Sequence, residues 1–255
     1  MSKTIYVNGV RVSYSRDCVT NNPQGILLFL HGWAGSSQSW EHNIWELSKT
    51  FECLAVDLPG FGVSGTPQQV WGMIEYAQFV RDFAGVLNLR RFALVGKSFG
   101  GRVAILYASK WPETLSHLIL VAAAGLEVKS FSTLIKIALA KAGKGVSSLL
   151  GAGAVEFLRS LYYKAARITK DSSSYKWEVR KLVTSLNLAE EAERIAVPTL
   201  IIWGRTDSVL PLKVGKELSK RIKNSTLQLI QGGHNAHQES AKEFNALVEE
   251  YLTSN

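Results

Sequence analysis

Short apolar segments recur along the chain and alternate with polar stretches. The first two, residues 4–7 and 10–15, alternate apolar and polar positions on either side of Asn8-Gly9, a dipeptide typical of a two-residue hairpin turn. Six later runs are almost continuously apolar, as are strands buried on both faces of a parallel sheet. These runs span residues 26–30, 53–56, 92–95, 118–121, 199–203 and 226–230. The pattern therefore predicts eight strands.

Apolar positions at helical spacing lie between most of these strands. The segments with this spacing are residues 74–87, 101–111, 212–222 and 241–252. A chain that alternates strand and helix through short connections forms a mostly parallel sheet with helices on both faces. We therefore expect an α/β fold with a mostly parallel eight-stranded sheet, in which the initial hairpin supplies an antiparallel edge.

One interval interrupts this alternation. Residues 126–196 contain no convincing strand, and apolar residues such as Phe131, Leu134 and Ala138 recur there at helical spacing. An insertion of about seventy residues is too long for a plain loop. We expect a helical cap over the C-terminal edge of the sheet, where open α/β sheets bind ligands. The predicted domains are a core of residues 1–125 and 197–255, and a cap of residues 126–196.

The composition is that of an ordinary globular protein. Of 255 residues, 46% are hydrophobic and 20% are charged, which provides enough apolar material for a sizeable core. Cys18 and Cys53 lack the spacing of a disulfide framework or a zinc site, so we expect two free thiols in a reducing compartment. The N-terminus lacks the apolar core of a signal peptide, and no apolar run is long enough to span a bilayer. We therefore expect a soluble, cytoplasmic protein without stable membrane insertion.

The net charge of +8 is concentrated in the expected cap. Residues 126–170 carry eight Lys or Arg and two acidic residues, a local charge of +6. This stretch could attract carboxylate substrates or anionic lipid surfaces, or its cations could solvate the outside of helices whose apolar faces pack inwards. We favour the second interpretation. No nucleic-acid-binding motif accompanies the charge, so we expect no nucleic-acid partner.

The strongest chemical signal is the segment Gly96-Lys97-Ser98-Phe99-Gly100-Gly101, which follows a predicted strand and precedes a predicted helix. This arrangement is typical of a nucleophile elbow, in which a strained turn lifts the serine above the sheet and the glycines avoid steric clashes. The start of the following helix favours developing negative charge. We therefore predict that Ser98 is a nucleophile.

With these features the sequence resembles the α/β-hydrolase fold superfamily, and within it the branch of small bacterial serine esterases and carbon–carbon-bond hydrolases. The resemblance covers nearly the whole chain, least clearly in the cap. It implies an oxyanion loop at His31-Gly32-Trp33, in which the backbone amides of Trp33 and Phe99 bind the oxyanion. It also implies that the Trp33 side chain walls the acyl pocket, while His31 braces the loop.

The same resemblance places the acid and the base of the active site. Asp207 follows the strand at 199–203, whereas the alternative acid position lies in residues 122–125, which contain no carboxylate. His234 follows the last strand behind Gly232-Gly233, and we prefer it to His237 as the base.

Two further residues of these motifs receive structural roles. Asp57 matches a fold marker, and we expect it to hold its turn through local backbone hydrogen bonds. Lys97 could tune the charge beside Ser98, although we favour a side chain directed away from the reaction.

The order Ser98, Asp207, His234 is that of this fold and implies acyl transfer without a metal or an organic cofactor. The favoured function is hydrolysis of a small-molecule carboxylic ester with a small to medium acyl group. A serine at position 98 disfavours dehalogenases and epoxide hydrolases, whose nucleophile in this fold is an aspartate. Carbon–carbon-bond hydrolysis of ring-cleavage diketones, cofactor-free perhydrolysis and a non-catalytic ligand-sensing role remain open. The sequence predicts no particular oligomeric state.

Overall fold

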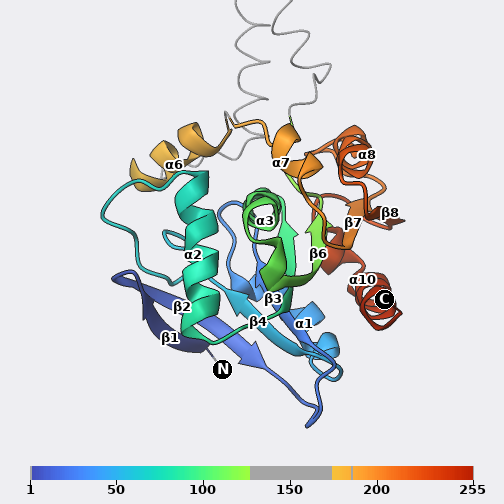
Figure 1. The fold of residues 1–255 in the computed structure, drawn as a ribbon, viewed down its shortest axis with the longest axis horizontal. Helices are drawn as coiled ribbons and strands as arrows, with labels where there is room; N and C mark the ends of the chain where they lie inside the picture. Colours follow the sequence, from blue (N-terminus) through green and yellow to red (C-terminus); the bar gives the residue numbers. More distant parts are fainter. Residues whose placement is uncertain (1, 127–173, 185, 255) are drawn as a thin grey trace, which may run out of the picture. The chain divides into compact units, whose positions relative to one another are not determined.

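The computed structural model describes residues 2–126, 174–184 and 186–254. Its chain divides into two compact units, of which the first, Met1–Leu126 with Glu178–Asn255, contains the sheet and the candidate site. All eight predicted strands are present in this unit (Figure 1). They are β1 (Ser2–Val7), β2 (Val10–Asp17), β3 (Ile26–Leu30), β4 (Glu52–Val56), β5 (Phe92–Lys97), β6 (Leu115–Val121), β7 (Thr199–Gly204) and β8 (Ser225–Ile230).

The strands form one sheet in the order β1-β2-β4-β3-β5-β6-β7-β8. Every neighbouring pair in the part β4-β3-β5-β6-β7-β8 is parallel. In contrast, β1 is antiparallel to β2, and β2 is antiparallel to β4. Asn8 and Gly9 have φ values of 51° and 77°, which suit a tight hairpin turn. The predicted α/β fold with an antiparallel edge is therefore confirmed.

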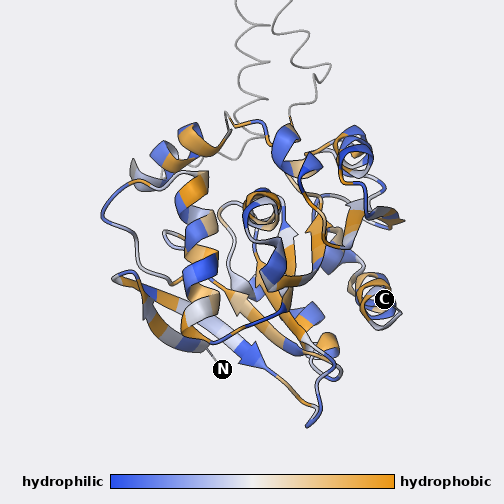
Figure 2. Cartoon of the chain, viewed as in Figure 1, coloured by the Kyte–Doolittle hydropathy of each residue, from blue (hydrophilic) through white to orange (hydrophobic). Residues whose placement is uncertain are grey.

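Helices cover both faces of the sheet. The described helices are α1 (Glu41–Leu47), α2 (Met73–Val86), α3 (Phe99–Lys110), α6 (Ser174–Thr184), α7 (Ala189–Glu193), α8 (Leu212–Arg221), α9 (Ala236–Glu239) and α10 (Ala241–Thr253). Among them, α1, α9 and α10 contact one another on one face, while α2, α3, α7 and α8 form a contacting series on the other (Figure 1). Figure 2 shows hydrophobic strands between helices that present hydrophilic positions outwards. The four predicted helices are present, and outside the expected cap α1 and α9 are additions to them.

The face under α1 and α10 has a continuous apolar core. Alternate residues of the central strands, such as Phe29, Val95 and Ile202, meet Trp40 and Phe244 from the covering segments, and all five are fully buried. Because side chains of a strand alternate between faces, the residues two positions apart in each strand belong to one core. This core holds the strands in place and thereby positions the loops at their C-terminal ends.

The expected cap, residues 126–196, lies mostly outside the described residues. Its described part includes α7 and the part of α6 that belongs to the first unit. There the Arg102 guanidinium, from α3, donates hydrogen bonds to the carbonyl oxygens of Val183 and Leu186. The cap as a domain, with its basic surface, stays a prediction. Within the described residues, no helix has the length and hydropathy required to cross a membrane.

We expect Gly215 in α8 to be required for stability, because the neighbouring Trp203 leaves no room for a side chain. A Cβ at Gly215 would lie 2.7 Å from Cε3 of the buried Trp203, so Gly215→Ala should lower the free energy of unfolding by about 1–3 kcal/mol. The matched variant Gly85→Ala, in α2, meets nothing within 4 Å and should raise it by up to about 1 kcal/mol. Equilibrium unfolding in urea measures both. An unchanged or increased stability of Gly215→Ala would show that this contact is not tight.

Candidate active site

Ser98 occupies the turn between β5 and α3 in a strained backbone conformation. Its φ of 52° lies in the left-handed region, which non-glycine residues rarely adopt. The close approach of the flanking segments explains the neighbouring glycines, because a Cβ at Gly96 would lie 2.5 Å from the carbonyl oxygen of Gly100 and one at Gly101 would lie 2.5 Å from Cβ of Ala123. The turn thus has the geometry expected of a nucleophile elbow.

The structure brings together the three residues that the sequence predicts for the reaction. Nε2 of His234 lies 3.1 Å from Oγ of Ser98, and Nδ1 of His234 lies 2.9 Å from Oδ2 of Asp207. In the neutral imidazole one ring nitrogen donates and the other accepts. An acidic partner at Nδ1 therefore favours the tautomer in which Nε2 accepts the Ser98 proton.

Asp207 is held in place by more than His234. Its side chain is fully buried, and Oδ1 accepts hydrogen bonds from the amides of Val209 (2.8 Å) and Leu210 (2.9 Å). Burial raises the pKa of this carboxyl group, but the hydrogen bonds from His234 and the two amides outweigh it, so the net pKa is below the ordinary 3.8. Asp207 is therefore ionised at neutral pH and can stabilise an imidazolium at His234.

His31 braces the loop after β3. Its Nε2 accepts a hydrogen bond from the Leu58 amide (3.0 Å), and its Nδ1 lies 2.7 Å from the carbonyl oxygen of Gly32. Burial lowers the pKa of His31 to about 4, so the ring is neutral at physiological pH. Its own carbonyl oxygen accepts from the Gly100 amide at 3.1 Å, which joins this loop to the elbow.

The backbone amides of Trp33 and Phe99 have no hydrogen-bond acceptor among the described residues. Trp33 belongs to the loop after β3, and Phe99 directly follows Ser98 as the first residue of α3. The two residues also contact each other, with ring centroids 5.4 Å apart in an edge-to-face arrangement. Two unpartnered amides from joined loops are the donor set that an oxyanion requires.

The side chains of Trp33 and Phe99 belong to a cluster of aromatic rings. The Trp33 ring packs edge-to-face on Phe61 (5.2 Å), and Phe99 packs in the same way on Tyr76 (5.2 Å). Trp33 is half-buried, whereas Phe61, Tyr76 and Phe99 are buried. The residues that carry the two amides therefore belong to one cluster of packed aromatic rings.

Asp57 has the structural role that we expected. It is buried, Oδ1 accepts from the Ser37 amide (2.6 Å), and Oδ2 accepts from the Val63 amide (2.9 Å). Its carbonyl oxygen accepts from Oγ of Ser64 at 2.7 Å. The carboxylate thus ties the loop after β4 to the loop after β3.

His237 is buried, with its ring centroid 4.5 Å from that of Trp40. Burial, with smaller contributions from Lys97 and His234, lowers its pKa to about 3. The structure therefore places His234, and not His237, beside Ser98.

Sequence reasoning missed two carboxylates that hold the turn before His234. Oε2 of Glu239 accepts a hydrogen bond from the Gly233 amide (2.6 Å), and Oε2 of Glu243 accepts one from the Gln231 amide (3.0 Å). The only signal in the sequence is a glycine-rich turn whose amides need acceptors, followed within ten residues by two glutamates.

Lys97 differs from our expectation. We expected its side chain to be directed away from the reaction, but its Nζ donates a hydrogen bond to Oδ1 of Asn235, the residue after His234 (2.8 Å). It therefore lies between the elbow and the histidine turn.

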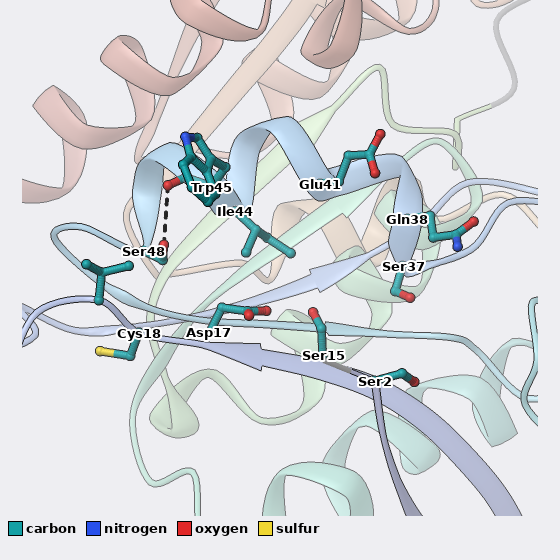
Figure 3. A pocket seen from close by; sticks show the side chains of 11 residues that line it. Ser2, Ser15, Asp17, Cys18, Ser37, Gln38, Glu41, Ile44, Trp45 and Ser48 are labelled. Carbon is teal, nitrogen blue, oxygen red and sulfur yellow. Dashed lines mark hydrogen bonds between the residues drawn. The ribbon is translucent and has the colours of Figure 1, made fainter.

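A cavity elsewhere in the molecule does not include these residues. It has a volume of about 470 Å³ and lies between β2 and α1, where Asp17, Glu41 and Trp45 line it (Figure 3). Among the described residues, no cluster of three or more His, Cys, Asp or Glu side chains could hold a metal ion.

A family model described as serine aminopeptidase, S33, matches residues 21–241. The chain belongs to this family. Monoacylglycerol lipase abhd6-A of Xenopus laevis is 29% identical over 257 residues, which cover 89% of this chain and 75% of the lipase. The predicted membership of the α/β-hydrolase superfamily is thus confirmed.

Solved structures show the same fold. A bacterial membrane phospholipase A aligns with a TM-score of 0.79 at 24% identity, over 100% of this chain and 86% of that chain. A mutant of the meta-cleavage product hydrolase CumD aligns with a TM-score of 0.72 at 23% identity, over 99% and 98% of the two chains. At these identities, the two structural comparisons establish a shared fold.

The structural role of Asp57 can be tested. Asp57→Asn replaces one acceptor oxygen by an amide group that faces a backbone N–H, so the free energy of unfolding should fall by about 1–3 kcal/mol. In the control variant Glu190→Gln, an exposed ion pair with Arg194 is lost, and we expect a change within about 0.5 kcal/mol. Urea unfolding compares them, and equal stabilities would contradict the assigned role.

Proposed function

We propose that this protein is a serine hydrolase that cleaves carboxylic esters of small to medium acyl groups through an acyl-enzyme on Ser98. The observation that carries the proposal is the hydrogen-bonded series Ser98–His234–Asp207 beside the two unpartnered amides of Trp33 and Phe99. A nucleophile within reach of a base, which is itself oriented by an acid, is the arrangement that acyl transfer requires.

In the first half of the reaction, His234 accepts the Ser98 proton while Oγ attacks the ester carbonyl carbon. The carbonyl oxygen becomes negatively charged and receives hydrogen bonds from the amides of Trp33 and Phe99. The protonated His234, stabilised by Asp207, then gives its proton to the alcohol oxygen as the ester bond breaks. The acyl group is left on Ser98.

In the second half, water takes the place of the alcohol. His234 accepts a proton from the water as it attacks the acyl-enzyme, and the same two amides stabilise the second oxyanion. The proton then returns to Oγ of Ser98 as the acid is released. Removing one oxyanion donor from such a site typically costs about 3–4 kcal/mol of transition-state stabilisation.

Two observations favour an ester with an apolar acyl group. The rings of Trp33, Phe61 and Phe99 pack against one another at the oxyanion amides, and an aromatic wall suits an acyl chain or a flat apolar group. The relative from Xenopus laevis is named a monoacylglycerol lipase. Trp33, which is half-buried, is the residue that we assign to the acyl pocket.

We expect a fluorophosphonate probe to label Ser98 in the folded protein. Ser98→Ala should abolish both labelling and ester hydrolysis, because no other group replaces the nucleophile. Asp207→Asn should lower kcat by about 10⁴-fold, since the asparagine favours the wrong tautomer of His234. The control variant Ser109→Ala, whose hydroxyl bonds only the Leu106 carbonyl of α3, should keep full activity. Absence of labelling in the wild-type protein would refute the proposal.

A substrate panel should separate the ester reaction from its neighbours. We expect p-nitrophenyl butyrate to be cleaved with a higher kcat/KM than a vinylogous diketone or an aminoacyl p-nitroanilide, which test carbon–carbon-bond and peptide-bond cleavage. Hydrogen peroxide added to the ester assay tests perhydrolysis. Preference for the diketone or the anilide would replace the ester assignment, and binding without turnover that survives Ser98→Ala would favour a ligand-sensing role.

A further inference from the structure

Lys97 is a charged residue at a position that the fold makes apolar. It is the last residue of β5, and Ala93 and Val95 precede it at two-residue spacing on the same face of the sheet. Both belong to the buried apolar core under α1 and α10. Lys97 therefore continues a core-facing row of side chains and directly precedes Ser98.

The Lys97 side chain contacts both loops that meet Ser98. Nζ donates a hydrogen bond to Oδ1 of Asn235 at 2.8 Å. The methylene stem covers Gly32 in the oxyanion loop, where an added Cβ would lie 2.9 Å from Cδ of Lys97 and 3.4 Å from Cβ of Ser98. One side chain thus joins the elbow, the oxyanion loop and the histidine turn.

The ammonium group is held there without a direct ion pair. Among the described residues, no carboxylate lies within 4 Å of Nζ. Burial lowers the pKa of Lys97 to about 8, although the charges of Asp207 and Glu239 oppose this shift. A partly desolvated cation is unfavourable for folding, so an apolar side chain of the same length would suit this position better for stability alone.

We propose that Lys97 is a positioning residue, which ties the His234 turn to the elbow and the oxyanion loop and so keeps His234 in line with Ser98. The inference rests on the proposed function of Ser98 and His234. Proton transfer depends on this alignment, and a displacement of about 1 Å can cost about 10²-fold in rate. Protonation of Lys97 strengthens the tie, because an ammonium group is a stronger hydrogen-bond donor than the neutral amine.

The charged groups around Lys97 determine how the activity should depend on pH. Asp207 and Glu239 face it as carboxylates. His31 and His237, whose pKa values are lowered to about 4 and about 3 by burial, stay neutral above pH 5. Lys97 is therefore the group of this set whose charge changes near pH 8, and loss of its proton should limit activity above that pH.

The test measures the rate of fluorophosphonate labelling, which needs an activated Ser98 and no knowledge of the substrate. Lys97→Met and Asn235→Ala should each slow labelling by about tenfold to a hundredfold. The double variant should be no slower than the slower single variant, because both changes break the same hydrogen bond. Lys97→Arg should restore part of the rate, and Lys110→Met, an exposed lysine at the end of α3, should label like wild type.

The pH profile gives a readout that packing alone would not change. Wild-type labelling should decline above about pH 8, Lys97→Met should lack this decline, and Lys97→Arg should move it to higher pH.

Thermal stability separates a positioning role from a structural one. Since the folded pKa of Lys97 lies below the unfolded value, the unfavourable term is fully present below about pH 8 and disappears as the pH approaches 10.5. Lys97→Met should therefore have a Tm at pH 7 at least equal to that of wild type. The difference in Tm between Lys97→Met and wild type should decrease as the pH rises above 8.

Three results would overturn the inference. Lys97→Met could label as fast as wild type, or it could label slowly with a lower Tm at pH 7, which would indicate a structural tie. It could also change only the KM of a carboxylate-bearing ester and not that of a neutral ester, which would assign Lys97 to substrate recognition. If the wild-type protein is not labelled at all, the proposed function itself fails, and this outcome is distinct from equal labelling of the two proteins.

Discussion

The left-handed backbone of Ser98 is the constraint on which the site depends. A non-glycine residue in this conformation is strained by about 1–3 kcal/mol and persists only where its surroundings fix it. Here the Ser98 amide donates to the Val121 carbonyl, and the Ser98 carbonyl accepts from the Ala124 and Arg102 amides. The elbow is thereby fixed to the end of β6 as well as to α3. Its strain is therefore balanced by the central sheet, which also fixes the position of Oγ relative to the loops around it.

Carboxylates organise these loops. At the C-terminal ends of the strands the sheet no longer supplies acceptors, so each buried N–H needs another partner. Asp57, Asp207, Glu239 and Glu243 accept hydrogen bonds from backbone amides in the loops after β3, β4, β7 and β8. Asp57 and Asp207 use the same chemistry, and each follows a buried strand. Asp207 differs in that its second oxygen contacts His234. The position of the histidine therefore decides which of the two aspartates can act as the acid of the site and which has a structural role.

The sheet and the chain positions of Ser98, Asp207 and His234 could be predicted because their signals are local. Continuous apolar runs bounded by turns identify the strands, and glycines mark the elbow and the histidine turn. Helix α1 was missed because it has seven residues and only Ile44 and Leu47 as buried apolar positions. Glu239 and Lys97 were missed or misjudged for another reason. Their contacts join segments that are distant in sequence, or depend on how a turn folds back, and no periodic pattern encodes either.

The charge balance at this edge of the sheet explains why a lysine can be useful where an apolar residue would pack better. Asp207 and Glu239 already place negative charge beside the histidine turn, and an oxyanion would add more at the Trp33 and Phe99 amides. The start of α3 supplies a partial positive charge through its N-terminal amides, and Lys97 adds a full charge one residue before Ser98. Sequences that break a local packing rule commonly do so at functional sites, where stability is exchanged for activity. Lys97, the last residue of the β5 row, is the clearest departure of this kind near Ser98. Its hydrogen bond to Asn235 connects it to the turn that carries His234.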